Sequence, residues 1–456
     1  MTDRSLPDTP SPDTPSPDTP GPDTPRDETP APPPPSPGRR TSVAIVAASL
    51  VAVLAGSVLF LSGWTIGRQT AITPGTPADE TSLFQPFWDT YRAITNRYAL
   101  GEVDRKALVE GAIKGMIGSL EDPYSFYMTS EEFKQSLESI SGEFEGIGAT
   151  IGTVDKDGNT ATCTDLGPDC RMVIVAPIAG SPAEQAGIAA GDVITAIDGS
   201  PLDGLTFDEA RTRIRGPKGT AVTLTIERDG AAPRDVEIVR AVIVTPEVET
   251  RTLADGTVGY VRLSAFSDHA SEQFADAIGA AVDAGRRSLA IDLRGNPGGY
   301  ITAARDITSQ FLADGTIFWQ EAADGTLIET RAKPGGEAVD PGIRVVVLVD
   351  GGTASASEIV TGALQDRGRA TIIGTQTFGK GTVQQWTQLE DDTGGFRLTI
   401  AKWLTPDRTW INGVGITPDI VVDAPPAKPG DDPVLERALE ELATQQGSRT
   451  MLRLAA

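Results

Sequence analysis

Two segments of this chain pair a candidate nucleophile with a candidate base. The first is Asp350-Gly351-Gly352-Thr353-Ala354-Ser355-Ala356-Ser357-Glu358, and the second contains Lys380, 25 positions after Ser355. The β-branched run from Ile343 to Val349 predicts a buried strand before the serine, and the apolar spacing from Glu358 to Leu364 predicts a helix after it. Such a serine would lie at a strand's carboxyl end, where open α/β sheets bind ligands. The chemistry would be nucleophilic attack by Ser355, with Lys380 taking its proton.

Ser355 also fits a purely structural role. Ser355 and Glu358 have the Ser-x-x-Glu spacing of a capping box, in which the serine would begin a helix. A second alternative is the chain's one histidine, His269, which could serve as the base of a Ser-His hydrolase. Lys380 fits the role of base because burial in an apolar pocket keeps an amine neutral, and Gln384, four positions later, could orient that amine.

A second glycine turn could stabilise the negative charge that such an attack creates. The predicted strand Ser288 to Leu293 leads into Asn296-Pro297-Gly298-Gly299, and we expect a helix after it. Backbone amides exposed at a helix start suit an oxyanion, so the amides of Gly298, Gly299 and Ala356 could form an oxyanion hole. The alternative is a tight strand-to-helix turn with no catalytic role.

Four segments of the chain carry a family resemblance: Asp122 to Ser125, Asp292 to Gly299, Gly352 to Ile359 and Phe378 to Gln384. Together they resemble the motifs of carboxyl-terminal processing (tail-specific) proteases, and the resemblance extends over roughly residues 82 to 445. It implies a β-rich PDZ domain preceding, or inserted in, an α/β core with the Clp protease/crotonase-like fold. By motif, the nucleophile corresponds to Ser355, the general base to Lys380 and the lysine-orienting residue to Gln384. No cofactor is implied.

The region from 141 to 230 has short predicted strands punctuated by glycine and resembles a bacterial PDZ domain. Two short helices are expected, one after Ser181 and one over Thr206 to Ile214. Such domains bind a peptide C-terminus by strand addition. By resemblance, the backbone amides of Gly146, Ile147, Gly148 and Ala149 would hold the carboxylate of protein substrates with free, apolar C-termini. The alternative is a glycine-rich strand start that binds no ligand.

The amino-terminal segment indicates an anchor in a membrane. Residues 1–41 repeat Pro-Asp-Thr-Pro and predict a disordered cytoplasmic tail. Residues 42–67 contain an uncharged apolar run, 43–64, about as long as a membrane-spanning helix. Arg39 and Arg40 precede this run, so we expect a single-pass protein of the cell membrane with its catalytic part outside the cytoplasm. A cleaved signal peptide is the alternative.

Composition limits the remaining possibilities. The 456 residues allow two or three domains, and a formal net charge of -24 argues against a nucleic-acid partner. The only two cysteines, Cys163 and Cys170, could form a local disulfide outside the cytoplasm or remain free thiols. No zinc motif accompanies them, because the chain has no second cysteine pair.

We expect a helical region over 82–140 with aromatic residues that could form a homodimer contact, an α/β serine protease core over 231–430, and a C-terminal helix and tail over 431–456. The predicted protein is a membrane-anchored serine endopeptidase that recognises protein C-termini and hydrolyses peptide bonds through an acyl-enzyme. The alternatives are a catalytically inert PDZ-type adaptor and a Ser-His hydrolase that uses His269.

Overall fold

The computed structural model describes residues 79–423, 428 and 430–454. The predicted tail, 1–41, and the predicted membrane span, 42–67, lie outside the described residues. Within the described ranges, no helix has the length and hydropathy that a membrane span requires. The chain divides into two compact units, and the boundary along the sequence falls between Val103 and Asp104.

Helix α2 (Thr81–Arg97) belongs to the first unit. Its aromatic residues contact one another edge to face in the order Phe84, Phe87, Trp88 and Tyr91. None of the residues of α2 is buried. These aromatics are therefore not part of a core in the single chain, and the homodimer contact stays a prediction.

The second unit contains the glycine-punctuated module as a sheet of seven strands with two short helices. Strands β5 and β8 carry the alternation of a half-buried sheet, with Met172, Ile174, Val222, Leu224 and Ile226 in one apolar cluster. Ser181 caps the first helix, as the sequence predicts, and Thr206, predicted as the first residue of the second helix, is its cap. The elements are β3 (Ala149–Asp155), β4 (Thr160–Ala161), β5 (Cys170–Pro177), α5 (Pro182–Gln185), β6 (Val193–Ile197), β7 (Ser200–Pro201), α6 (Phe207–Ile214), β8 (Ala221–Glu227) and β9 (Arg234–Val239).

The module continues past residue 230, the boundary that the sequence pattern predicts for it. Residues 229–230 form the turn of a hairpin, and β9 pairs antiparallel with β8 on its far side. Strand β2 (Glu143–Gly146) then pairs with β10 (Ala241–Val244), which joins the segment entering the module to the segment leaving it. The module is thus an insertion held at its base by one pair of strands.

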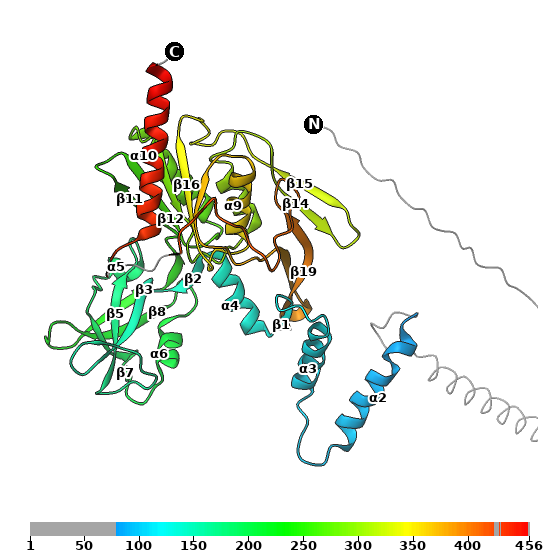
Figure 1. Ribbon diagram of the computed structural model, residues 1–456. Helices are drawn as coiled ribbons and strands as arrows, with labels where there is room; N and C mark the ends of the chain where they lie inside the picture. Colours follow the sequence, from blue (N-terminus) through cyan, green and yellow to red (C-terminus); the bar gives the residue numbers. More distant parts are fainter. Residues whose placement is uncertain (1–78, 424–427, 429, 455–456) are drawn as a thin grey trace, which may run out of the picture. The chain divides into compact units, whose positions relative to one another are not determined.

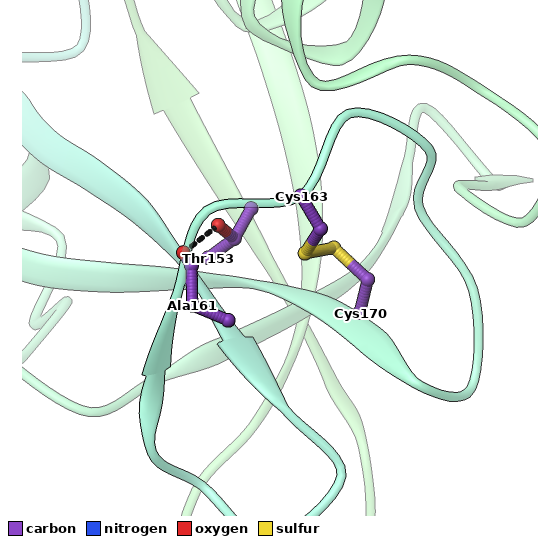
Figure 2. Close-up of a disulfide and its surroundings, with 4 residues drawn as sticks. All are labelled: Thr153, Ala161, Cys163 and Cys170. Atoms are coloured by element: carbon purple, nitrogen blue, oxygen red, sulfur yellow. Dashed lines mark hydrogen bonds between the residues drawn. A yellow bond between two sulfur atoms is a disulfide. The ribbon is translucent and has the colours of Figure 1, made fainter.

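Cys163 and Cys170 form a disulfide at the edge of this module (Figure 2). The bridge closes a loop of seven positions between β4 and β5. Next to it, the Thr153 hydroxyl donates to the Ala161 carbonyl, which fastens β3 to β4. Of the two alternatives that the sequence leaves open, the structure has the bonded one.

The core is a six-stranded sheet in the order β11-β12-β13-β16-β17-β20, parallel except for β11. Alternate residues of each strand face opposite sides. Leu289 and Ile291 belong to an apolar cluster with residues of α7, α8 and α9, whereas Ala290 belongs to a cluster with residues of α10. Helices α9 and α10 are seen on either side of strand β16 (Figure 1). The elements are β11 (Val248–Leu253), β12 (Val258–Leu263), α7 (Ala270–Asp283), β13 (Ser288–Asp292), α8 (Ile301–Thr308), β16 (Arg344–Val349), α9 (Ala356–Asp366), β17 (Thr371–Gly374), β20 (Ile420–Val421) and α10 (Pro433–Leu454).

A second core sheet is built around the long strand β19, which pairs with β1, β14 and β18. Strand β1 comes from the region that the sequence predicts as helical, and its pairing with β19 attaches residues 126–128 to the core. The elements are α3 (Arg105–Gly118), β1 (Phe126–Met128), α4 (Ser130–Ser141), β14 (Thr316–Ala322), β15 (Leu327–Arg331), β18 (Thr382–Gln388), the 3-10 helix η1 (Glu390–Asp392) and β19 (Gly395–Leu404).

Candidate active site

Ser355 lies in the turn between β16 and α9, as the sequence predicts. Its backbone has φ +57° and ψ -114°, a conformation that costs a non-glycine residue about 1–3 kcal/mol. The residue is 9% exposed and contributes to the wall of a cavity. A strained serine between a strand and a helix, open to a cavity, is the arrangement in which hydrolases present a nucleophile.

Glu358 holds the serine turn and the lysine loop together. Its carboxylate is fully buried. Oε2 accepts hydrogen bonds from the backbone amides of Ser355 (2.8 Å) and Lys380 (2.9 Å). Oε1 accepts from the Thr377 hydroxyl (2.6 Å) and the Gly379 amide (2.7 Å). The capping-box glutamate therefore does more than begin a helix, because one oxygen fixes the backbone of both candidate catalytic residues.

Gly298 belongs to a turn that packs directly on the serine turn. A Cβ at Gly298, which has φ +96°, would lie 2.7 Å from the Ala354 carbonyl oxygen and 2.8 Å from the Ala356 nitrogen. Only glycine allows this approach. The Gly298 amide donates to Asn296 Oδ1 at 2.9 Å, so it already has a partner. The three predicted oxyanion-hole residues, Gly298, Gly299 and Ala356, thus come from two turns in contact with each other.

Asn296 fixes the same turn from below. It is fully buried, and its Nδ2 donates to the Leu263 carbonyl at the end of β12. The backbone carbonyl of Asn296 accepts hydrogen bonds from the Ala354 amide and from the Ser357 hydroxyl, both at 3.0 Å. The glycine turn and the serine turn are therefore attached to each other and to the sheet.

One cavity of about 620 Å³ collects the predicted residues. Ser355, Lys380, Gln384, Gly298 and Gly299 all contribute to its wall. In the described part of the chain no hydrogen bond joins the Ser355 hydroxyl to the Lys380 amine. Such contacts are commonly long without substrate and tighten when it binds. The structure brings the candidate nucleophile and the candidate base to one cavity.

Lys380 has the environment that a neutral amine requires. Burial lowers its pKa to about 8, and the positive charge of Arg397 acts in the same direction, whereas Asp122 and Glu358 oppose the shift. The amine lies 4.9 Å from the centre of the Tyr124 ring. The Trp403 indole donates to the Lys380 carbonyl at 2.8 Å and helps to fix its backbone.

Gln384 lies in β18 and contributes to the same cavity, but its hydrogen bonds lead elsewhere. Its amide nitrogen donates to the hydroxyls of Thr382 (2.8 Å) and Thr399 (3.1 Å). Its carbonyl accepts from Arg397 at 3.4 Å. The role of Gln384 in orienting Lys380 stays a prediction.

His269, the alternative base, does not contribute to the wall of this cavity. Its Nε2 lies 2.6 Å from Glu143 Oε1 on β2, at the base of the inserted module. The described residues around Ser355 therefore offer Lys380, and not His269, as a base.

The predicted carboxylate-binding segment, 146–149, runs from the last residue of β2 to the first residue of β3. The Ile147 carbonyl accepts from the Ala183 amide, and the Gly148 carbonyl accepts from the Ser181 hydroxyl at 2.8 Å. Gly148 has φ +77°, and a Cβ there would lie 2.4 Å from Ser181 Cβ. The segment is thus held through its carbonyls against the start of α5, a helix of the same module.

Two residues of the site have no assigned role in the sequence analysis. Tyr124 belongs to the Asp122 to Ser125 motif, and Ser125 ties that motif to β19 by accepting from the Thr399 amide at 2.9 Å. Arg397 is also on β19 and contributes to the cavity wall. The motif itself was a usable signal for Tyr124. For Arg397 there was none, because a single arginine in a strand has no distinguishing pattern.

Comparison with known proteins gives three family matches. Residues 257–422 match peptidase family S41, residues 173–228 match the PDZ domain, and residues 69–132 match the N-terminal domain of the activating protease CtpB.

Similar proteins include a carboxy-terminal-processing protease of Bartonella bacilliformis, 39% identical over 80% of this chain and 81% of that protein. The carboxy-terminal processing protease CtpA of Bacillus subtilis is 37% identical over 84% of this chain and 76% of that protein. Among solved structures, the photosystem II D1 C-terminal processing protease has 26% identity and a TM-score of 0.43, covering 80% of this chain and 92% of that chain.

Replacing Glu358 should disable the site. In Glu358→Gln an amide NH₂ replaces one acceptor oxygen and faces backbone donors, which should lower the free energy of unfolding by at least about 2 kcal/mol. Displacement of either catalytic residue should reduce turnover about a hundredfold. Urea unfolding and peptide hydrolysis measure the two effects. Glu209→Gln, which changes the exposed capping box of α6, is the matched control and should change neither much. Normal turnover in Glu358→Gln would show that the carboxylate does not position the pair.

Proposed function

This chain belongs to peptidase family S41 and is a carboxy-terminal processing serine protease, and we propose that it cleaves peptide bonds with a Ser355–Lys380 dyad. The observation that carries the proposal is the cavity in which Ser355 meets a lysine whose pKa burial lowers to about 8. At pH 7 such an amine is neutral in roughly a tenth of molecules, compared with less than a thousandth for an ordinary lysine.

The reaction would proceed through an acyl-enzyme. The hydroxyl oxygen of Ser355 attacks the carbonyl carbon of the substrate, and neutral Lys380 takes the proton that this hydroxyl loses. The oxyanion is stabilised by backbone amides of the two contacting turns, from Gly299 and Ala356, with Gly298 joining if it releases Asn296. Protonated Lys380 then gives its proton to the leaving amine. A water molecule that loses a proton to Lys380 hydrolyses the ester and regenerates the serine. Gln384 would orient the amine after exchanging its present partners.

Substrates would be selected by their C-termini. The 146–149 segment would present backbone amides to the carboxylate, and the peptide would extend the sheet of the PDZ domain as an added strand. The carbonyls of the 146–149 segment already accept hydrogen bonds from the start of α5. These bonds support the proposal because they would hold the segment in place while its amides bind a ligand. Residues 43–64 would anchor the protein in the cell membrane with the protease outside the cytoplasm.

Ser355→Ala and Lys380→Ala should each abolish peptide-bond hydrolysis, because each removes one member of the dyad. The rate in the unmodified protein should rise with pH and level off above about 8, because the base must be neutral and its pKa is lowered to about 8 from 10.5. Hydrolysis of an unstructured protein by residues 69–456 measures the loss of activity in the two variants and the pH dependence of the rate in the unmodified sequence. His269→Ala is the control and should retain most of the activity. Full activity in Lys380→Ala would overturn the mechanism, and binding without any cleavage by the unmodified protein would indicate an adaptor.

Binding to the PDZ domain should depend on a free carboxylate. With Ser355→Ala to prevent cleavage, a peptide with an apolar, free C-terminus should bind at least about tenfold more tightly than its amidated form, because a carboxylate accepts charge-assisted hydrogen bonds from several amides. Fluorescence anisotropy can measure the affinities. Gly148→Ala should remove the preference. Gly158→Ala is the matched control, since Gly158 also has a positive φ but a Cβ there meets nothing within 4 Å. Equal affinities in the parent protein would exclude this role.

The anchor makes a prediction about topology. Protease added to cells with permeable outer layers should digest the residues after 68 and leave the proline-rich tail intact, because Arg39 and Arg40 favour the cytoplasmic side. Immunoblotting with tags at each end reports the two regions. Digestion of the tail with protection of the catalytic region would reverse the orientation.

A further inference from the structure

The catalytic cavity has a charge opposite to that of the whole protein. The chain has a formal net charge of -24. Among the described residues that form the cavity wall, however, the charged ones are Lys380 and Arg397, both cations. The dyad requires Lys380 to be neutral, but Arg397 remains protonated at any working pH. A permanent positive charge therefore faces the space where a substrate would bind.

Arg397 is held rigidly but is not neutralised. Its guanidinium carbon lies 4.9 Å from the Trp386 ring centre and 5.4 Å from that of Phe126. Within the described ranges no carboxylate lies within ion-pair distance of it, and its buried Nε has no hydrogen-bond partner. Its one hydrogen bond is the long contact with Gln384. A partly buried cation with one long hydrogen bond and no ion pair is unfavourable in the free protein, because the charge of Asp122 acts on it only from beyond ion-pair distance, so an anionic ligand would be strongly attracted.

The chemistry of Arg397 identifies the class of ligand. A guanidinium presents a planar set of N–H donors that fits a carboxylate in a bidentate contact. A peptide substrate offers carboxylates at its C-terminus and on acidic side chains. The cavity volume of about 620 Å³ is in the range that encloses a drug-sized ligand, which corresponds to a short peptide end. A carboxylate bound here would therefore lie only a few residues from the scissile bond.

We propose that Arg397 is a substrate-binding residue that holds a carboxylate of the peptide inside the catalytic cavity. This inference rests on the proposed Ser355–Lys380 protease activity. It goes beyond that activity, because it gives the cleavage site its own selection for a nearby carboxylate, separate from the PDZ domain. The preferred substrates would be peptides cut close to a free C-terminus, with a short leaving fragment that carries the terminal carboxylate.

The test compares the cleavage of free-acid and amidated forms of one short peptide by the full-length protein in detergent solution. The unmodified protein should cleave the free acid with a kcat/KM at least about tenfold higher, the fold-change expected for losing a charge-assisted contact. The ratio should fall to near one in Arg397→Gln and to an intermediate value in Arg397→Lys, which keeps the charge but not the planar donors. Because kcat/KM reports the ionisation of the free enzyme, any change in the basicity of Lys380 that the substitution itself causes is the same for both peptides and cancels in the ratio.

Arg286→Gln is the matched control. Arg286 is also partly buried, its Nε also has no partner among the described residues, and it does not contribute to the cavity wall. This variant changes the net charge by the same amount and should keep the ratio. An amidated peptide with a penultimate glutamate distinguishes the two carboxylate sources, because recovered cleavage would show that a side chain can replace the terminus.

The outcomes separate the two proposals. If no variant or parent cleaves any peptide or unstructured protein, the protease mechanism fails and this inference fails with it. If the parent cleaves both forms equally, only the Arg397 role is excluded. If the preference persists in both Arg397 variants but disappears in Gly148→Ala, the PDZ domain reads the carboxylate and the Arg397 role is overturned. Thermal unfolding of each variant identifies any loss that comes from misfolding.

Discussion

The buried carboxylate of Glu358 is the constraint on which the candidate active site depends. Ser355 and Lys380 belong to different turns, and each turn alone could adopt many positions relative to the other. One oxygen of Glu358 accepts from both backbone amides, so the distance between the two residues is limited by two short hydrogen bonds. Because the charge is fully buried, its loss cannot be compensated by water. The strain at Ser355 persists because this carboxylate and the packed glycine turn of Gly298 hold it.

Local pattern predicted the elements that carry the chemistry. The buried strand before Ser355, the helix after it and the short capped helices of the PDZ domain all occur where residue type and spacing indicate them. Their signals are strong because each depends on neighbours in the sequence: apolar alternation, a capping serine or threonine, and glycine at a turn. The Ser355–Glu358 pair also shows the limit of such signals. A capping box predicts that the glutamate side chain accepts one hydrogen bond, from the amide at the helix start. It does not predict the three further donors that Glu358 receives from residues 377–380.

Contacts between distant segments could not be predicted in the same way. The motif at Tyr124 reaches Lys380 because β1 pairs with β19, across more than 260 positions of sequence. The hairpin partner β9 lies beyond a turn that resembles a domain boundary, and only the β8–β9 register shows that the sheet continues. Arg397 is part of a strand whose apolar and polar residues alternate from Phe396 to Ile400, but this alternation does not show which site the polar face meets, and the position of Arg397 in the cavity depends on the pairing of β18 with β19. Pairing between strands that are far apart in the sequence, such as β1 and β19, is not specified by the local pattern of either strand.

The charges around Lys380 connect substrate binding to base strength. Arg397 favours the neutral amine, whereas Asp122 and Glu358 favour the charged one. A substrate carboxylate on Arg397 would offset its positive charge and raise the pKa of Lys380, which makes the amine a stronger base during attack by Ser355 but less often neutral. When the leaving fragment departs with its carboxylate, the positive charge of Arg397 is no longer offset, and the pKa of Lys380 falls again. Lys380 would then be more often neutral at the stage at which it must activate water. The same arginine would thus bind the fragment before cleavage and favour hydrolysis of the acyl-enzyme after its release.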